Sequence, residues 1–317
     1  MNYLFIDIEC ADGNCAICEF GYVLTDENFN VIRKVNILID PEHRFNLTNR
    51  KDHRDLILTY PESEYSKYYP FDDTYNTIKS LVTSKDTMVF GFSVANDINF
   101  LLKDSDRYKL KALEFDAYDV QKMQNFFDKE KKLGKNLESV TDELVPSDKL
   151  KDLKDHRGSD DAMKTMLVFK ALVEKFNIAP NELIELCKNF KVNSIDVLEQ
   201  NKRKKEEKEI YNKKKNMRKQ GTELCQEMSE EHKALLNKPE SKGKLVVMSG
   251  EMREHLDELK IVLSFIKDEG YIMLNQIGGS NFFIVFDEED ACKIKDTLKH
   301  EYLGEIITFK DFMRINN

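Results

Sequence analysis

The sequence contains no tryptophan, a single CxxC pair and no apolar run long enough to cross a bilayer. Because no second CxxC is present to complete a zinc site, Cys15 and Cys18 are predicted to be reduced, partly buried thiols. The chain opens directly on the apolar residues 3–6, without a basic region or a small-residue cleavage site. These absences predict a cytoplasmic or nucleoid-associated protein that has no membrane partner.

Composition and charge narrow the class of protein further. The 317 residues are 41% hydrophobic, which supports globular cores and excludes a disordered chain. This length favours two domains joined by a connector. The net charge of −9 does not exclude a nucleic-acid partner, because carboxylates that hold divalent cations reverse the local field. Residues 202–219 are positively charged, unlike the chain as a whole, because they include ten basic and three acidic side chains.

Residues 1–176 mix strand and helix patterns, which indicates an α/β domain. Residues 2–9, 16–24 and 31–39 are predicted strands with hairpin-like connections, so the sheet should open antiparallel. The polar residues 41–70 should form loop and short helix. Further strands are predicted at 87–92 and 115–119, and helices at 74–82, from 97 to 102, and at 120–127, 137–144 and 159–176.

The rest of the chain changes character twice. Residues 177–240 contain hardly any strand pattern and are predicted to form a helical, basic connector. The connector should end at the break in residues 239–243. Residues 241–317 then show the order strand–helix–strand–strand–helix–strand–helix, which predicts a small, self-contained α/β domain.

Two acidic residues end the first predicted strand. Asp7 and Glu9 stand two residues apart, so both side chains leave the same face of the strand. Two buried acids side by side are costly unless cations neutralise them. Oxygen ligands of this kind suit Mg²⁺ or Mn²⁺. Surface charge is the simpler explanation for such a pair alone.

Two later segments place acids in compatible settings. Asp97 begins a helix directly after a buried strand, where capping of that helix is the alternative reading. His156 precedes the predicted helix at 159–176, and Asp161 lies in the first turn of that helix. A histidine here can serve as a base, because its ordinary pKa lies near neutral pH.

The order Asp-x-Glu, Asp, His-x4-Asp resembles the DEDD exonuclease superfamily, in its histidine subclass. This subclass includes the proofreading subunit of bacterial replicative DNA polymerase. Residues 17–23 match the family's second strand, and residues 137–140 match its short helix before the histidine. The resemblance covers residues 1–176 and implies a ribonuclease H-like mixed sheet. The residue five positions after the histidine is Asp161, so the neighbouring Asp160 is expected to be a surface or capping residue.

The resemblance also implies the chemistry. Asp7, Glu9, Asp97 and Asp161 would hold two divalent cations, Mg²⁺ or Mn²⁺, and His156 would be the general base. The enzyme would hydrolyse phosphodiester bonds at the 3′ end of single-stranded DNA and release nucleoside monophosphates. RNA trimming by a 3′→5′ exoribonuclease is the alternative, because the motifs do not separate the two substrates.

Residues 241–317 resemble a BRCT domain. The supporting residues are 243–244 and 249–250 around the first strand, Gly270, Lys293 and residues 306–312, although the family's usual tryptophan is missing. The resemblance implies a protein or DNA partner in replication or repair. Ser249 and Lys293 match phosphate-binding positions, with a turn residue and a solvated lysine as the alternative. A non-catalytic BRCT scaffold is the rival from another functional class.

Overall fold

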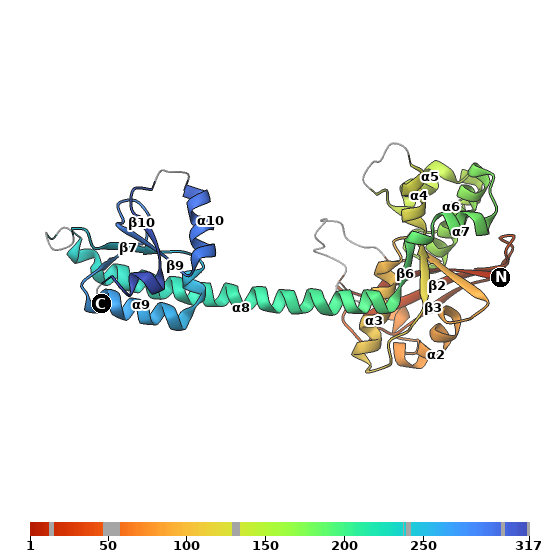
Figure 1. Cartoon of the computed structure of the whole chain (residues 1–317). Coiled ribbons are helices and arrows are strands. Elements are labelled where there is room, and N and C mark those ends of the chain that lie inside the picture. The colour runs from red at the N-terminus through yellow and green to blue at the C-terminus, as the bar shows by residue number, and fades with distance from the viewer. Residues whose placement is uncertain are drawn as a thin grey trace. The chain divides into compact units, whose positions relative to one another are not determined.

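The computed structural model describes residues 1–12, 16–46, 58–128, 134–236, 238, 242–298 and 302–315. The chain divides into two compact units, Met1–Lys202 and Arg203–Asn317, and each is considered by itself (Figure 1). The predicted turn at residues 12–14 and the predicted domain boundary at residue 240 fall partly or wholly outside the described residues.

Six described strands form the sheet of the first unit, in the order β3-β2-β1-β4-β5-β6. β1 (Asn2–Cys10), β2 (Ile17–Thr25) and β3 (Val31–Leu38) pair antiparallel, as the hairpin-like connections predicted. β4 (Thr87–Gly91) joins β1 in parallel, and β5 (Asp116–Asp119) joins β4 in parallel. The predicted mixed sheet is therefore confirmed.

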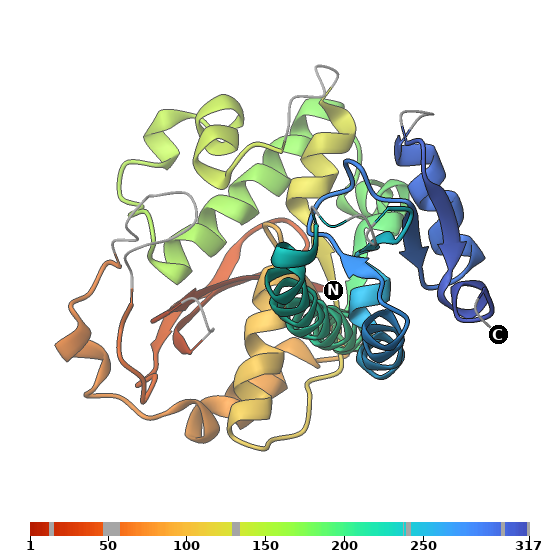
Figure 2. The same ribbon diagram turned by 90° about the vertical axis from the view of Figure 1, so that its left-hand side faces the viewer.

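Helices cover both faces of this sheet. α2 (Phe71–Val82) and α3 (Ala95–Arg107) pack on one face, and α4 (Val120–Phe127), α5 (Leu137–Leu144) and α6 (Gly158–Phe176) pack on the other (Figure 2). The polar stretch after β3 contains the short helix α1 (Glu62–Tyr65). Part of that stretch, residues 47–57, lies outside the described range.

Side chains of β1 alternate between these two layers. Leu4, Ile6 and Ile8 are buried in the core with α2 and α3. Tyr3 and Phe5 are buried in the core with α4, α5 and α6. Because successive strand residues point to opposite faces, the odd-numbered positions 7 and 9 belong to the α6 side. The period of the strand thus directs both acidic side chains towards the helix that carries Asp161.

The segment after residue 176 departs from the predicted helical connector. α7 (Pro180–Leu186) and a short 3₁₀ turn lead into β6 (Lys191–Asn193), which pairs antiparallel with β5. Leu183, Ile184 and Cys187 are buried in the same core as α6. The first unit therefore continues beyond residue 176. Sequence pattern missed β6 because three residues are too few to show strand alternation, and only pairing with β5 defines them.

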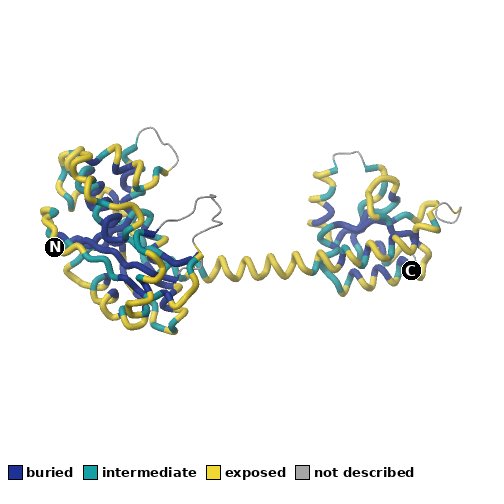
Figure 3. Tube along the Cα trace, turned by 180° about the vertical axis from the view of Figure 1, so that it is seen from behind, coloured by how far each residue is buried: buried dark blue, intermediate teal, exposed yellow. Residues whose placement is uncertain are grey.

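The helix that follows is long and mostly solvated. α8 (Ser194–His232) is 39 residues in length, and its central residues are exposed on every side (Figure 3). Cys225 and His232, near its C-terminal end, are buried in the second unit. The His232 ring accepts a hydrogen bond at Nδ1 from the Met273 amide, 3.1 Å away. This end of α8 is thus a structural part of the second unit.

The second unit is built on a parallel sheet of four described strands in the order β10-β9-β7-β8. Its core includes Val246, Leu259, Ile284 and Phe312, together with Cys225 of α8. The elements follow the predicted order, namely β7 (Leu245–Met248), α9 (Leu256–Asp268), β8 (Ile272–Met273), β9 (Phe282–Val285), α10 (Glu288–Leu298), β10 (Glu305–Thr308) and α11 (Phe309–Phe312).

The cysteines within the described ranges are not in disulfide bonds. Cys10, Cys18, Cys187 and Cys225 are buried, and Cys292 is exposed. Cys15 lies outside the described residues, so the predicted state of the CxxC pair stays a prediction. In the parts of the chain that the structure covers, every helix is too short or too polar to cross a lipid bilayer.

A fragment ending at Lys202 is expected to fold, whereas one ending at Phe176 is expected to be far less stable. The shorter fragment loses β6 and leaves the sites of Leu183 and Ile184 empty. Deleting one buried Leu or Ile side chain alone costs about 2–5 kcal/mol. Thermal unfolding followed by circular dichroism compares both fragments with the full chain. Equal melting temperatures for the two fragments would contradict a first unit that extends to Lys202.

Candidate active site

The end of β1 supplies the first two carboxylates. Asp7 and Glu9 both lie on the α6 face, and the pairing of β1 with β2 becomes irregular after Glu9. Asp7 is partly buried, and the Glu9 side chain is 13% exposed. The two acids therefore lie at the protein interior and not on a freely solvated surface, which argues against the simple surface-charge explanation.

Asp97 joins these residues from α3. It lies in the first turn of that helix and is only 5% exposed. Its Oδ1 accepts a hydrogen bond from the Ile8 amide at 3.0 Å, between the two acids of β1. The N-cap of α3 is Val94, so Asp97 is not the capping residue. This hydrogen bond ties the start of α3 to the end of β1.

His156 and Asp161 are placed together by a local backbone turn. His156 adopts a left-handed conformation with φ of 56°, and its amide donates to Asp161 Oδ2 at 2.9 Å. The Thr59 hydroxyl donates to the His156 carbonyl at 3.0 Å. The ring nitrogen Nδ1 lies 3.7 Å from Glu9 Oε1, and the side chain is 49% exposed. The backbone of His156 is thus held on both sides while its ring remains accessible to solvent.

The structure brings three of the five predicted residues within reach of one ion. Among the described residues, Glu9, His156 and Asp161 offer ligand atoms that all lie within 4.8 Å of one another. Burial raises the pKa of Asp7 well above its ordinary value, and the charges of Asp97, Glu9 and Asp161 raise that pKa further. Asp7 and Asp97 are therefore linked to this group by charge, and Asp97 also by its hydrogen bond to the Ile8 amide.

The electrostatics of the cluster fit a cation site. Burial is the main cause that raises the pKa of Asp97 and of Asp161 as well. Four carboxylates gathered in a protected site repel one another, and a divalent cation bound among their oxygens would remove that repulsion. Oxygen-rich ligand sets of this kind suit Mg²⁺ and Mn²⁺.

A close contact between two glycines positions Asp161. Gly21 of β2 pairs with Asp7, and a Cβ atom at Gly21 would lie 1.8 Å from the Gly158 carbonyl carbon. A Cβ at Gly158 would lie 3.1 Å from the Asp7 carbonyl oxygen. No side chain fits at either position, so the first turn of α6 rests directly on the β1–β2 pair.

Glu19 secures the same helix end, and the sequence reading gave it no role. Its buried carboxylate accepts hydrogen bonds from the Tyr65 hydroxyl at 2.5 Å and the Gly158 amide at 3.2 Å. Asn36 donates to Glu19 at 2.7 Å and accepts from the Ser159 amide at 3.1 Å. The available signal was an acid inside the apolar strand 17–24, where a buried charge needs several partners.

Two further charged residues of α6, Lys164 and Asp160, are buried. Lys164 is buried, and its ammonium group contacts Asp161 Oδ1 at 2.7 Å and Asp155 Oδ1 at 2.5 Å. These contacts partly offset the rise in the pKa of Asp161. Asp160 is buried instead of lying on the surface as predicted, and it pairs with Lys34 and Arg157. Helical periodicity turns Asp160 inward, and the two cations make its burial possible.

Sequence comparison identifies the family of the unit that contains this site. The RNase_T family, described as exonuclease, matches residues 4–169, which include all five residues of the cluster. The chain belongs to the RNase T exonuclease family. The predicted DEDD-superfamily exonuclease is confirmed at this level. None of the curated proteins matches this exonuclease in sequence.

Several solved structures are similar to the exonuclease. One is the nuclease domain of 3′hExo, a DEDDh family member bound to rAMP, at 15% identity and a TM-score of 0.44, covering 56% of this chain and 94% of that one. Another is E. coli exonuclease I in complex with a dA16 oligonucleotide, at 16% identity and a TM-score of 0.43. The latter match covers 58% of this chain and 42% of exonuclease I.

The proposed phosphate-binding pair of the second unit is not arranged for an anion. The buried Ser249 hydroxyl donates to Asp290 Oδ2 at 2.5 Å and accepts from the Met252 amide at 2.9 Å. Lys293 is exposed and pairs with Glu289 at 2.8 Å and Glu251 at 3.4 Å. Carboxylates beside both groups oppose phosphate. These contacts favour the alternative, in which Ser249 is a turn residue and Lys293 a solvated lysine.

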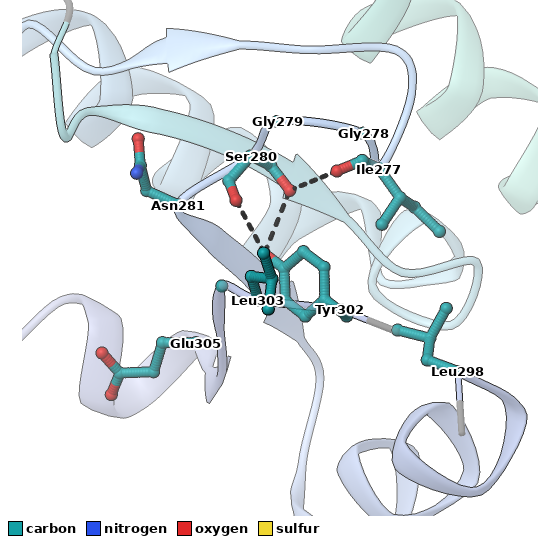
Figure 4. Close-up of a pocket in the computed structure, with 10 residues that line it drawn as sticks. Ile277, Gly278, Gly279, Ser280, Asn281, Leu298, Tyr302, Leu303 and Glu305 are labelled. Carbon is teal, nitrogen blue, oxygen red and sulfur yellow. Dashed lines mark hydrogen bonds between the residues drawn. The ribbon is translucent and has the colours of Figure 1, made fainter. Parts of the chain in front are cut away.

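A cavity of about 590 Å³ lies in the second unit of the exonuclease (Figure 4). Its polar groups satisfy one another, because the Ser280 hydroxyl donates to the Ile277 carbonyl at 2.9 Å and lies 3.0 Å from the Tyr302 hydroxyl. None of its lining residues belongs to the five-residue cluster. The cavity therefore has no part in the candidate active site.

Replacing Asp7 by asparagine is expected to stabilise the metal-free exonuclease. Because the pKa of Asp7 is raised on folding, the folded state keeps a proton that the unfolded state loses, and stability falls as pH rises through that pKa. At neutral pH or above, Asp7→Asn should raise the melting temperature, by about 2–4 °C for each kcal/mol of repulsion removed. Mg²⁺ should stabilise the wild type, by about 2.7 kcal/mol at a hundred times its dissociation constant, and the variant much less.

Asp26 provides the control for this experiment. Hydrogen bonds from Asn30 lower the pKa of Asp26, so Asp26→Asn should not stabilise the chain. Melting curves in EDTA and in Mg²⁺ test both variants. Two results would contradict a cation site among these carboxylates. One is a melting temperature of metal-free Asp7→Asn below that of the metal-free wild type, and the other is equal stabilisation of the wild type and Asp7→Asn by Mg²⁺.

His156 is expected to titrate above its ordinary pKa in the metal-free exonuclease. The contact with Glu9 is the main cause that raises the pKa of His156. Glu9→Gln should bring that pKa back down, because it removes the negative charge beside the ring. Titration followed by NMR measures both proteins, and His232 is the internal reference because burial lowers its pKa. If the pKa of His156 is the same in the wild type and in Glu9→Gln, the His156 ring and the Glu9 carboxylate do not interact.

Proposed function

We propose that this chain is a metal-dependent 3′→5′ exonuclease of the histidine subclass that acts on single-stranded DNA. It hydrolyses the phosphodiester bond at the 3′ end and releases nucleoside monophosphates. The observation that carries the proposal is the convergence of Glu9, His156 and Asp161 beside Asp7 and Asp97, inside the segment that matches the exonuclease family.

Asp7, Glu9, Asp97 and Asp161 would hold two divalent cations, Mg²⁺ or Mn²⁺. When bound, such ions make a water molecule more acidic and stabilise charge on the scissile phosphate. Two of these carboxylates are held by backbone amides, Asp97 by that of Ile8 and Asp161 by that of His156. Groups fixed in this way need no reorganisation during the reaction.

His156 would remove the proton from the attacking water. Its ring is half exposed, so a water molecule can reach it, and Glu9 is close enough to stabilise the protonated ring that results. The base must start neutral. The fraction of active enzyme should therefore increase as pH rises through the pKa that His156 has with the cations bound.

The second unit would supply a BRCT-like partner-binding module for replication or repair. Its elements follow the strand–helix–strand–strand–helix–strand–helix order that the sequence predicts. DNA is the preferred substrate because BRCT modules commonly accompany proteins of DNA metabolism. With Ser249 and Lys293 paired to carboxylates, we do not assign a phosphate site to this unit.

Digestion of labelled oligonucleotides tests the proposed activity. Matched single strands of DNA and RNA, labelled at the 5′ end, are incubated with Mn²⁺ or with EDTA. We expect stepwise shortening from the 3′ end, only with metal, and faster on DNA. Faster digestion of RNA would replace the proposed substrate with RNA, and no digestion of either strand would support the scaffold alternative.

Substitutions within the site assign the roles. Asp97→Asn should abolish turnover, because it removes a charged ligand but keeps the acceptor for the Ile8 amide. His156→Ala should slow turnover by about 10²–10⁴-fold, the usual effect of losing a general base, while Mg²⁺ still raises its melting temperature. His255→Ala in the second unit is the matched control. Wild-type rates for Asp97→Asn or His156→Ala would overturn the assignment.

A further inference from the structure

The centre of α8 is a long surface that the site does not use. Within the described chain, every residue from 202 to 216 is exposed (Figure 3). A helical segment with no buried face is not held by a hydrophobic core, so its charged side chains are presented to solvent. Ten of the chain's basic residues fall between residues 202 and 219, although the whole chain has a net charge of −9.

Part of this charge lies along one line of the helix. Lys204, Lys208, Tyr211 and Lys215 follow one another at intervals of four, three and four residues. With 3.6 residues per turn, this spacing places the four side chains on one face, over a length of about 16 Å. We call these four residues the basic stripe. Tyr211 lies within it and is 65% exposed.

The acidic residues of the segment are spaced to pair mainly with basic residues outside the stripe. Glu206, Glu207 and Glu209 stand four residues from Lys202, Arg203 and Lys213, respectively. Residues at this spacing are neighbours on a helix surface and form ion pairs. Glu207 stands three positions from Lys204, but no acidic residue stands three or four positions from Lys208 or Lys215. The positive charge of the basic stripe is therefore offset at most at Lys204.

We propose that the basic stripe binds the backbone of single-stranded nucleic acid, with a base stacked on Tyr211. Lysines release counterions from phosphates and supply affinity without sequence preference. An exposed aromatic ring among cations is the combination that binds unpaired bases, whereas bases in a duplex already stack on one another. That the bound strand is also the substrate rests on the proposed function.

Two triple variants of the full chain separate this face from general positive charge. The stripe variant replaces three lysines of the basic stripe by glutamine, namely Lys204, Lys208 and Lys215. The control variant replaces three basic residues outside the stripe by glutamine, namely Lys202, Arg203 and Lys213. Both lose three charges, and glutamine keeps a high helix propensity. Fluorescence anisotropy with labelled dT40, in EDTA so that nothing is cleaved, gives affinity against salt concentration. The stripe variant should flatten the salt slope by about 2, or 0.7 for each lost contact, and the control should not change it.

Tyr211→Ala completes the test. It should weaken binding of dT40 by at least about five-fold and leave the salt slope unchanged, because stacking releases no counterions. The proposal is overturned if the two triple variants lose affinity equally, if neither does, or if duplex DNA binds wild type as well as dT40 does. It is also overturned if the stripe variant binds heparin more weakly than the wild type does but binds dT40 with unchanged affinity. That result would identify another acidic partner.

Cleavage of a five-nucleotide strand separates this proposal from the proposed function. The stripe variant should cleave it at the wild-type rate, since the substitutions lie outside the catalytic cluster. If the wild type fails to cleave at all, the proposed function fails and the binding comparison still stands. If cleavage is normal but the salt slopes of the two triple variants agree, only the basic stripe is wrong.

Discussion

Direct backbone contact between β2 and the first turn of α6 is the constraint on which the candidate site depends. Gly21 and Gly158 leave no room for a side chain at this contact. Glu19 then fixes the Gly158 amide from inside the sheet. Because Asp161 lies in that first turn and bonds the His156 amide, the contact also sets the position of the histidine. A small shift of α6 would separate these groups from Glu9.

The same arrangement concentrates negative charge at a cost in stability. Burial and mutual repulsion raise the pKa of Asp7, so the metal-free folded state is strained at neutral pH. Lys164 compensates part of this negative charge, because its buried ammonium group contacts Asp161. One lysine cannot balance four carboxylates, and the excess charge makes the site receptive to divalent cations.

Charge is distributed unevenly along the rest of the chain. Acidic residues dominate overall, yet the exposed centre of α8 is basic, and Lys208 and Lys215 on one face of it have no acidic neighbour at helical pairing distance in the sequence. The last part of α8 changes character because Cys225 and His232 are buried in the second unit. The last turns of α8 are thus held by packing in the second unit. The exposed part can interact with other molecules only through its solvent-exposed side chains, most of which are charged.

The sequence by itself determined the strands of residues 1–39 and the order of the elements after residue 244, and it predicted the five residues of the candidate site, because alternation and motif spacing are local properties. Tertiary structure alone decided the rest. β6 exists through its pairing with β5, and Asp160 is buried because Lys34 and Arg157 reach it. Ser249 is a turn residue because Asp290, 41 positions away, accepts its hydroxyl. Contacts between distant residues leave no trace in local spacing, so only the folded chain reveals them.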